Sequence, residues 1–384
     1  MKWRVLMLDK NRAYRFIFLM GLVSLLADFT YEGAKGIIGP YLAHLGASAL
    51  LISIISGLSE LAGYWTRLFS GFVSDRFKSF WGITLLGYAL NLFSVPLLGF
   101  VKGWQLAGFL VFLERFGKGL RTPTRDVLLS RATAFVGHGK GFGIHEFLDQ
   151  VGAVLGPMFV GLMLFMGLGY KTAFLSLFVP ASLALLLLFL ARKHYGYIPD
   201  KDKERMQTTN VNKNLYFYLF ASCLVSFSFL QFPLVGFHFS QHQHLEEWKV
   251  ALLFALAMGV DALSALIFGI LYDRIGFLAL SVGLIFGMLS PLFLFMFDQP
   301  ILAMVLWGIS LGVQESIMRS GVARLSSESS RGRAYGLFHF FFGLSAFLGG
   351  VLMGILYETS KEILVLYSLA LHLIAIGVIT RLKL

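Results

Sequence analysis

The chain has 384 residues, of which 57% are hydrophobic and only 14% are charged, and its mean hydropathy is +0.75. Soluble domains carry about 25% charged residues, so this composition practically excludes a soluble enzyme, while the 39 Phe residues exclude a disordered chain. The single cysteine, Cys223, allows neither an internal disulfide nor a cysteine-based zinc site. We therefore expect an integral membrane protein that is not an enzyme and carries no cofactor.

Apolar runs long enough to cross a bilayer, about 20 residues each, recur along the whole chain. The first run follows a basic start, but no small-residue cleavage site closes it, so we expect a retained helix rather than a signal peptide. The expected fold is an all-α membrane protein of about twelve transmembrane helices. In chain order the predicted spans are 14–43, 47–70, 80–102, 103–127, 139–166, 171–193, 214–238, 249–270, 277–297, 299–325, 333–357 and 362–380.

The net charge of +11 is distributed very unevenly between the two sides of these spans. Of the 32 Lys and Arg residues, 22 fall on the side of the N-terminus and 6 within spans, leaving Lys102, Lys171, Lys249 and Lys361 on the other side. Such asymmetry is typical of the positive-inside rule. We expect a multi-pass protein of the cell (inner) membrane with both termini in the cytoplasm, and no nucleic-acid partner.

One long polar stretch divides the chain near its midpoint. We expect residues 194–213 to form a cytoplasmic linker between an N-terminal half, 1–193, and a C-terminal half, 214–384. The halves share a glycine pattern at a constant offset of 193, in which Gly143, Gly156 and Gly161 correspond to Gly336, Gly349 and Gly354. This repeat predicts two pseudo-symmetric six-helix bundles, and parallel repeats of this kind place a substrate path between the halves.

Three motifs accompany this repeat. After the second span the chain carries Gly71-x-x-x-Asp75-Arg76, and after the eighth span Gly269-x-x-x-Asp273-Arg274. The fourth span contains Arg115-x-x-Lys118-Gly119. The fifth span carries Gly143, Gly152, Gly156, Pro157 and Gly161.

With these motifs the chain resembles the major facilitator superfamily over essentially its whole length, and in particular its drug/proton antiporters of bacterial or archaeal type. The resemblance implies a gating role for the two Gly-x-x-x-Asp-Arg motifs and associates the fifth-helix motif with exporters.

Each motif also has a simpler structural interpretation. Asp75 and Asp273 either latch onto the positive N-terminus of a neighbouring helix or are merely charged helix ends. Gly152 and Gly156 present two bare patches one turn apart for a close helix contact. Pro157 favours a bend at this point. Helix packing alone and a role in transport direction remain equal alternatives for the fifth-helix motif.

Fourteen ionisable residues fall within the predicted spans, and each costs about 3 kcal/mol at mid-membrane if it is unpaired. They are expected to pair with one another or to line a wet cavity rather than to face lipid. The set is Asp28, Glu32, Lys35, Glu60, Arg67, Glu114, Arg115, Lys118, Arg121, Glu146, Asp149, Asp261, Glu315 and Arg319.

Helical spacing places Asp28, Glu32 and Lys35 on one face of the first helix. Lys35 is the one evident cationic neighbour of the two carboxylates, and a carboxyl group in such a setting can load and release a proton. We predict proton coupling at Asp28, Glu32 or both.

The fourth and fifth helices carry a second charged group. The i, i+4 spacing predicts pairs between Glu114 and Lys118 and between His145 and Asp149. A network between the two helices is also predicted, because basic residues line the fourth helix and acidic residues the fifth. Its predicted members are Arg115, Lys118, Arg121, Glu146 and Asp149.

This network is either a static structural element or part of the coupling site. On the tenth helix Glu315 and Arg319 repeat the i, i+4 spacing. They are candidates for substrate contact or for pairing between the halves.

The connection after the seventh span contains His238, His242 and His244, followed by Glu246 and Glu247. Imidazole and carboxylate groups at such spacing are candidate ligands for a transition metal. The alternative, a polar helix end without metal, is favoured here.

The function predicted from these features is secondary active transport by alternating access, with proton-coupled export of a small amphiphilic organic compound. No phosphate-binding loop of the G-x-x-x-x-G-K-[ST] type occurs in the sequence, so drive by ATP is not expected. The expected partners are a small-molecule substrate, protons and membrane lipid, and a monomer is expected. Two alternatives remain open, a transition-metal ion exporter and a non-transporting membrane sensor or scaffold.

Overall fold

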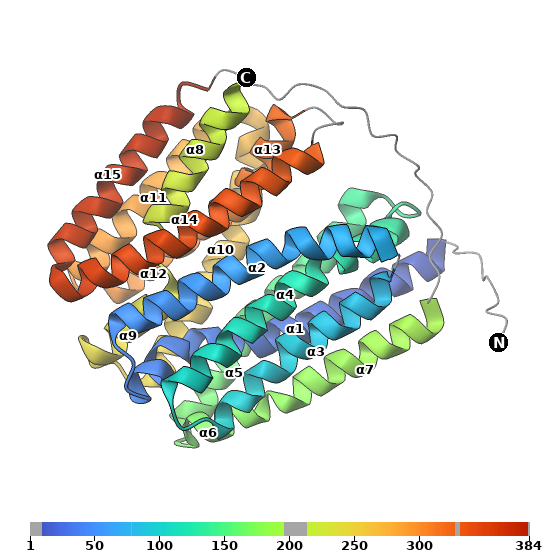
Figure 1. Ribbon diagram of the computed structural model, residues 1–384, viewed down its shortest axis with the longest axis horizontal. Coiled ribbons are helices and arrows are strands. Elements are labelled where there is room, and N and C mark those ends of the chain that lie inside the picture. Colours follow the sequence, from blue (N-terminus) through green and yellow to red (C-terminus); the bar gives the residue numbers. More distant parts are fainter. Residues whose placement is uncertain (1–9, 78, 196–212, 327–330, 383–384) are drawn as a thin grey trace.

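The computed structural model describes residues 10–77, 79–195, 213–326 and 331–382, and the regular structure within these ranges is entirely helical (Figure 1). The helices form two bundles. The first bundle comprises α1 (Lys10–His44), α2 (Ala49–Phe77), α3 (Phe80–Leu97), the short 3₁₀ turn η1 (Leu98–Phe100), α4 (Trp104–Thr133), α5 (His138–Phe165), α6 (Gly169–Ser176) and α7 (Phe178–Tyr195).

The second bundle follows residues 196–212, most of the expected linker, which lie outside the described residues. It comprises α8 (Lys213–Ser228), α9 (Phe232–Gln241), α10 (Glu247–Ile275), α11 (Phe277–Phe295), α12 (Pro300–Val313), the π-helical turn η2 (Gln314–Met318), α13 (Arg319–Leu325), α14 (Arg331–Thr359) and α15 (Lys361–Ile379).

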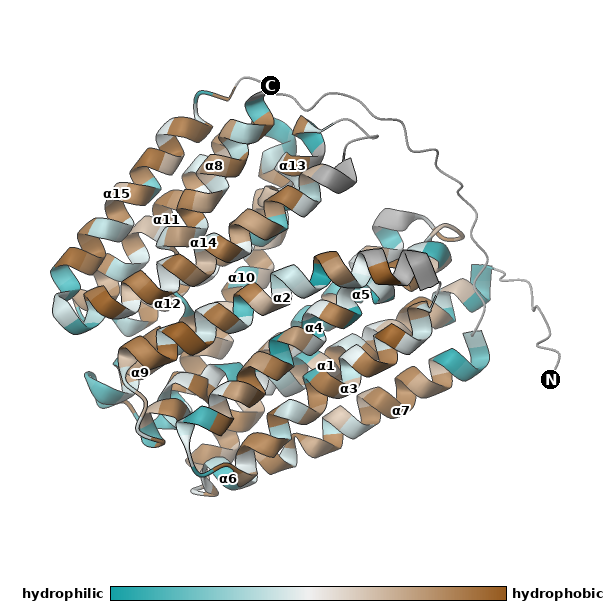
Figure 2. Cartoon of the chain, in the orientation of Figure 1, coloured by the Kyte–Doolittle hydropathy of each residue, from teal (hydrophilic) through white to brown (hydrophobic). Residues whose placement is uncertain are grey.

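The predicted all-α membrane fold is confirmed. In the described part of the chain, eleven helical segments are long and apolar enough to cross a bilayer. The twelfth long helix, α4, has 30 residues and occupies the predicted fourth span, but it carries a high density of charged residues. Figure 2 shows apolar residues over most of each helix and hydrophilic residues at helix ends and along α4.

Three predicted spans are interrupted rather than continuous. The sixth breaks at Leu177, between α6 and α7. The seventh breaks between α8 and α9, where Pro233 lies in the first turn of the second piece and cannot donate a backbone hydrogen bond. The tenth changes to π-helical geometry over Gln314–Met318, between α12 and α13. Such π-helical turns occur frequently at functional sites, and this one contains Glu315.

Close backbone contacts confirm the pseudo-symmetry of the bundles. A methyl group on Gly156 of α5 would lie 2.3 Å from the carbonyl oxygen of Phe29 on α1. In the second bundle, a methyl group on Gly349 of α14 would lie 2.1 Å from the carbonyl oxygen of Phe227 on α8. Each glycine therefore lets two helix backbones touch, as small residues do in membrane bundles.

The contacts between the bundles repeat in the same way. Gly161 of α5 packs against Ala251 of α10, and Gly354 of α14 packs against Ser53 of α2. The glycines differ by 193 positions, the offset found in the sequence, and their partners differ by 198, the separation of Gly71 from Gly269 in the two Gly-x-x-x-Asp-Arg motifs. The two bundles therefore meet along two equivalent helix pairs.

We call the end of the molecule where α1 begins and α15 ends the terminal end, and the opposite end the far end. The two bundles are joined most tightly at the far end. At the far end Gly39 of α1 lies against the carbonyl group of Pro233 on α9, and the Leu50 N–H donates to the Glu358 carboxylate at 2.9 Å. A mixed apolar cluster there includes Ala49 and Ala153 together with second-bundle residues. Toward the terminal end the two bundles diverge (Figure 1).

Candidate functional site

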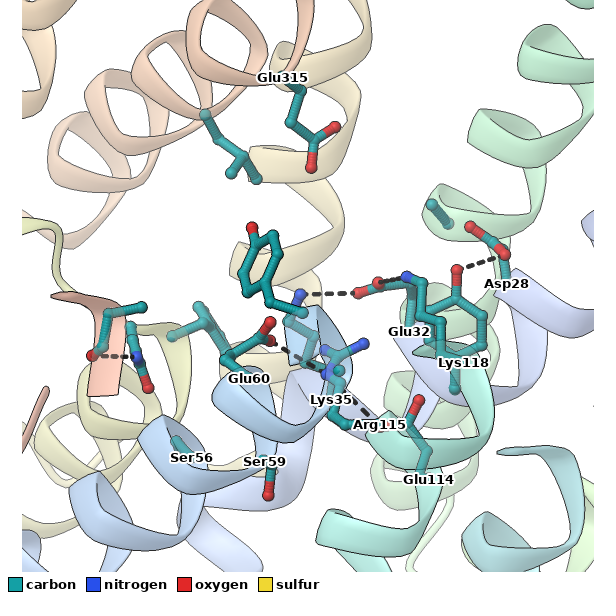
Figure 3. A pocket seen from close by; sticks show the side chains of 18 of the residues that line it. Asp28, Glu32, Lys35, Ser56, Ser59, Glu60, Glu114, Arg115, Lys118 and Glu315 are labelled. Atoms are coloured by element: carbon teal, nitrogen blue, oxygen red, sulfur yellow. Dashed lines mark hydrogen bonds and ion pairs between the residues drawn. The ribbon is translucent and has the colours of Figure 1, made fainter. Parts of the chain in front are cut away.

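A cavity of about 360 Å³ lies between the two bundles and is lined by both of them. Along α4 its lining extends from Leu110 to Asp126, which is about 24 Å at 1.5 Å per residue. Most of its charged lining comes from α1, α2, α4 and α5 of the first bundle, while the second bundle contributes mainly aromatic and other apolar side chains. Figure 3 shows the carboxylates and cations of the first bundle directed toward one another in this space.

Glu32 of α1 lies at the centre of the first charged group. Its carboxylate pairs with Lys35 at 3.3 Å, as the spacing predicts, and also with Lys118 of α4 at 3.7 Å. Lys118 lies 4.0 Å from the centre of the Tyr31 ring. Glu32 therefore has two cationic partners rather than the one evident in the sequence, and this favours its ionised form.

Arg115 of α4 forms the second group. Its Nε lies 3.0 Å from a carboxylate oxygen of Glu60 on α2 and 3.5 Å from one of Glu114 (Figure 3). The Asn91 side chain of α3 donates to Glu114 at 2.7 Å. The predicted pair between Glu114 and Lys118 is wrong, because Lys118 is turned toward α1.

Asp28 lies one turn before Glu32 and has a different environment. It is 5% exposed, and the Tyr31 hydroxyl donates to its carboxyl group at 2.5 Å. The structure shows no ion pair to Asp28 among the described residues. Asp149 lies on α5, which packs on α1 through Gly152 and Leu25, and it lines the same cavity. Asp149 is half-buried, and its buried oxygen Oδ1 has no hydrogen-bond partner in the described part of the chain.

The predicted ion-pair network between α4 and α5 is not formed by the described residues. On α4, Arg115 and Lys118 pair with carboxylates of α1 and α2, and Arg125 pairs with its own neighbour Asp126 at 2.8 Å. Helix α1 packs along α5, so α4 meets carboxylates of α1 before it reaches those of α5.

Arg121, a further member of the predicted network, also has different partners. Arg121 donates to the Asn91 side chain at 3.2 Å and lies 4.1 Å from the centre of the Tyr88 ring. The predicted contact of His145 with Asp149 is wrong, since His145 bonds to the Ser24 hydroxyl at 3.0 Å. Glu146 lines the cavity but has no ion pair in the described part of the chain.

Glu315 and Arg319 both line the second-bundle side of the cavity. Their side chains do not form the predicted ion pair; instead, the Arg319 Nε donates to the backbone carbonyl of Glu315 at 3.1 Å. The π-helical turn between them alters the usual i, i+4 register. Figure 3 shows the Glu315 carboxylate projecting toward the cavity from the second bundle.

Asp261 departs from the expectation that buried charges pair or line a cavity. It is fully buried on α10, neither carboxylate oxygen has a partner in the described part of the chain, and it is not part of the cavity lining. The backbone of α12 approaches it closely at Gly312.

The two predicted gating motifs lie at helix ends. Gly71 lies within α2, and the side chains of Asp75 and Arg76 are outside the described residues. Gly269, Asp273 and Arg274 end α10, and the two charged side chains are exposed. Asp273 makes no hydrogen bond or ion pair with described residues, so the predicted latch is not formed at Asp273.

The fifth-helix motif lies in α5 and its glycines differ in their contacts. Gly152 and Gly156 pack on the α1 backbone and Gly161 on α10, whereas Gly143 faces open space. Pro157 lies inside the helix and borders Gly36. The packing role is therefore confirmed, and the role in direction remains a hypothesis.

The rings of His238 and His242 stack with centres 5.4 Å apart, but the three predicted metal-ligand candidates do not form one group. His238 is buried and its Nδ1 bonds to the Tyr357 hydroxyl at 3.0 Å, while the His242 Nδ1 lies 3.2 Å from the Lys361 ammonium group. Partial burial, Lys361 and His244 lower the pKa of His242. No group of three metal-ligating side chains occurs within the described ranges.

Sequence reasoning missed some of the residues that matter here. Tyr31 was not singled out, although its position three residues after Asp28 places both on one helix face. Asn91 bridges Glu114 and Arg121, and no sequence signal marks it.

Comparisons with known proteins agree with the membrane fold described above. The sequence profile of the Major Facilitator Superfamily matches residues 18–350. An uncharacterised protein of Mycobacterium tuberculosis is 38% identical over 375 residues, covering 95% of this chain and 92% of that protein. A homologue of the multidrug resistance efflux pump PmrA from Lactococcus lactis is 26% identical over 178 residues, 45% of this chain and 44% of that protein. The crystal structure of the nucleoside transporter NupG (D323A mutant) superposes with a TM-score of 0.77 over 94% of this chain and 99% of that chain; at 14% identity this likeness concerns the fold alone.

Proposed function

Because the chain belongs to the Major Facilitator Superfamily, a family of membrane transporters, we propose that it exports a small amphiphilic organic compound in exchange for protons. It is a secondary active transporter that works by alternating access. Residues 1–193 and 214–384 are the two moving halves, and both termini are cytoplasmic. The structure then represents an inward-facing state, closed at the far end.

The observation that carries this proposal is the contrast between two carboxyl groups on α1. Glu32 is held by two cations, whereas Asp28 is buried beside Asp149 with a tyrosine hydroxyl as its partner. The carboxyl groups of Asp28 and Asp149 both line the cavity, from adjacent helices. Two such groups repel one another when both are ionised, and one shared proton removes that repulsion. Asp28 with Asp149 is therefore the proton site, and Glu32 a structural one.

An amphiphilic substrate matches the two chemically different walls of the cavity. Charged side chains of the first bundle face aromatic residues of the second, among them Phe229, Trp307 and Phe342. Export is favoured by the fifth-helix motif and by the similarity to an efflux-pump homologue. One proton moving through 100 mV releases about 2.3 kcal/mol, enough for roughly fiftyfold accumulation.

The test is transport by purified protein in liposomes with an imposed pH gradient. Substrates are first selected by thermal stabilisation, since a bound ligand raises apparent stability. We expect wild-type protein to accumulate such a ligand when the gradient is present. Failure to move any ligand that stabilises the protein would instead support a membrane sensor.

Proton coupling is tested with Asp28→Asn. This variant should bind the ligand and equilibrate it across the membrane without responding to the gradient. The control Asp298→Asn changes an exposed carboxylate at the far end and should behave as wild type. A wild-type gradient response in Asp28→Asn would move the coupling site to Glu146 or Asp149.

A further inference from the structure

Six Lys and Arg side chains line the cavity in the described part of the chain, and they divide into two groups. Four of them, all in the first bundle, each have a carboxylate partner within 4 Å. The other two, Arg67 and Arg319, have no carboxylate partner among the described residues. The four paired cations are Lys35, Arg115, Lys118 and Arg125.

Arg67 lies on α2 with its guanidinium carbon 5.3 Å from the centre of the Tyr64 ring. Its Nε is buried and has no hydrogen-bond partner in the described residues. A buried donor without a partner costs about 1–3 kcal/mol, and a ligand acceptor would remove this cost. Arginine also presents a planar set of donors that matches carboxylate, sulfonate or phosphate groups.

His339 lies on α14 of the second bundle and shares the same tyrosine. Its ring stacks on Tyr64 with centres 5.7 Å apart and an angle of 25° between planes. Its Nδ1 is also buried without a partner in the described residues. The Tyr335 ring stacks on His339 with centres 6.3 Å apart, and its hydroxyl donates to the backbone carbonyl of Arg319 at 2.9 Å. Arg67, Arg319 and His339 therefore form one group on the cavity wall.

Glu146 and Glu315 line the same cavity, but among the described residues no carboxylate forms an ion pair with Arg67 or Arg319. Glu60 is paired with Arg115, and Asp126 with Arg125. Glu315 lies one turn before Arg319 but forms no ion pair with it. Two unpaired arginines and two buried, unpartnered nitrogen atoms thus face a cavity that has aromatic residues beside them.

We propose that Arg67, Arg319 and His339 bind the anionic group of the transported compound, which is an organic anion with an apolar body. This inference rests on the proposed function and specifies its substrate class. The apolar body packs on Phe338 and Phe342, which line the same part of the cavity and are in ring contact with each other. Arg67 belongs to the first bundle and the other two residues to the second, so the bound anion also draws the bundles together.

The test compares three probes with one ring system and different charge: 1-naphthoate, neutral 1-naphthamide and cationic 1-naphthylmethylammonium. Affinities for purified protein are measured by isothermal titration calorimetry in the same detergent. Wild-type protein should bind naphthoate at least tenfold more tightly than either analogue. Equal or weaker binding of the anion, or no binding of any probe, would overturn the proposal.

Two substitutions locate the site. Arg67→Gln and Arg319→Gln should each weaken naphthoate binding about tenfold or more and leave naphthamide binding unchanged, since a charge-assisted hydrogen bond contributes about 1.5–3 kcal/mol. Arg67→Lys should recover part of the loss. The control Arg192→Gln alters an exposed arginine outside the cavity and should bind all three probes as wild type. Unchanged naphthoate affinity in both glutamine variants, with unfolding temperatures showing folded protein, would refute the site.

This outcome is separable from that of the proposed function. Charge-selective binding lost in the arginine variants, without movement of naphthoate in liposomes, would support the anion site and contradict transport. A protein that binds the three probes equally but moves other compounds in response to the proton gradient would support transport and contradict the anion site.

Discussion

The two walls of the cavity hold their charged groups in different ways. In the first bundle Glu32, Glu60 and Arg115 lie in ion pairs with distances of 3.0–3.7 Å. In the second bundle Arg319 uses only a backbone carbonyl, and the ring nitrogen Nδ1 of His339 has no partner in the described residues. The comparison teaches that the ion-paired cluster of the first wall is compensated before any solute arrives, whereas Arg67 beside that cluster and the second wall retain unused donors.

The largest expected effect comes from removing the central cation of the first wall. Arg115→Ala leaves the buried Glu114 and the partly exposed Glu60 without their cation. Breaking a buried ion pair by removing one partner costs about 3–5 kcal/mol, and the exposure of Glu60 places the expected loss at the lower end of that range. The free energy of unfolding of the detergent-solubilised protein measures this loss. Arg319→Ala should cost less than about 1 kcal/mol, because no ion pair is lost; an equal cost at both positions would abolish the contrast between the walls.

The two bundles share a close contact between two helix backbones, at Gly156 in the first bundle and at Gly349 in the second. Gly156→Ala and Gly349→Ala each force a methyl group against a carbonyl oxygen on the adjacent helix, so both should lower the free energy of unfolding by about 1–3 kcal/mol. Gly259→Ala is the control, since a methyl group there meets open space. A large effect at only one of the two positions would show that the halves are not equivalent in packing.

The aromatic side of the second wall is tested with Phe342→Ala. Phe342 lines the cavity and contacts Tyr64 edge-on with ring centres 5.5 Å apart. Loss of this surface should weaken binding of naphthoate and naphthamide alike, by about five- to tenfold, because about 1 kcal/mol of aromatic contact is removed. Calorimetric titration of both probes provides the measurement, and a loss confined to the anion would assign Phe342 to the charged site instead.

A smaller effect is expected from the pH dependence of His242 at the far end. Its pKa is lowered in the folded protein, so the unfolded state binds the proton more readily. The resulting stability is fully present above the usual imidazole pKa of about 6.5 and is lost as the pH falls below it. Unfolding temperatures between pH 7.5 and pH 5 should therefore fall slightly less in His242→Gln than in wild type; identical slopes would contradict this assignment.

No effect is expected on metal tolerance when His242 and His244 are both replaced by Ala. His238 bonds to Tyr357 and the three rings do not form one group, so no metal site is lost. Growth of cells producing each protein in graded Zn²⁺ or Ni²⁺ is the measurement. Altered tolerance in the double variant would restore the metal-exporter alternative.

Much of the fold was predictable because its signals are local. Apolar runs predicted the spans, and the glycines at offset 193 predicted the repeat that the contacts of Gly156 and Gly349 confirm. The interruptions of the sixth, seventh and tenth spans were not predicted. Pro233 is a visible cause of the break in the seventh, but the π-helical turn at Gln314–Met318 in the tenth has no comparable local signal.

The candidate site was predictable in its membership but not in its pairing. Asp28, Glu32 and Arg115 all line the cavity, as expected of ionisable residues within membrane spans. The partners of Lys118 and His145 were predicted wrongly, because i, i+4 spacing identifies neighbours on one helix and carries no information about the helix that faces it. Arg67 and His339 became a single group only through Tyr64, which lies between residues 272 positions apart in sequence.

The sequence by itself determined that this protein crosses the membrane in about twelve helices arranged as two related bundles, since hydropathy and repeated glycines act over one or two helical turns. Only the tertiary structure decided that α4 offers its cations to α1 and α2 rather than to α5, and that Asp28 remains outside those ion pairs. The physical reason is that an ion pair depends on the rotation of each helix about its axis and on distances of 3–4 Å. Those quantities are set by the packing of all the helices together.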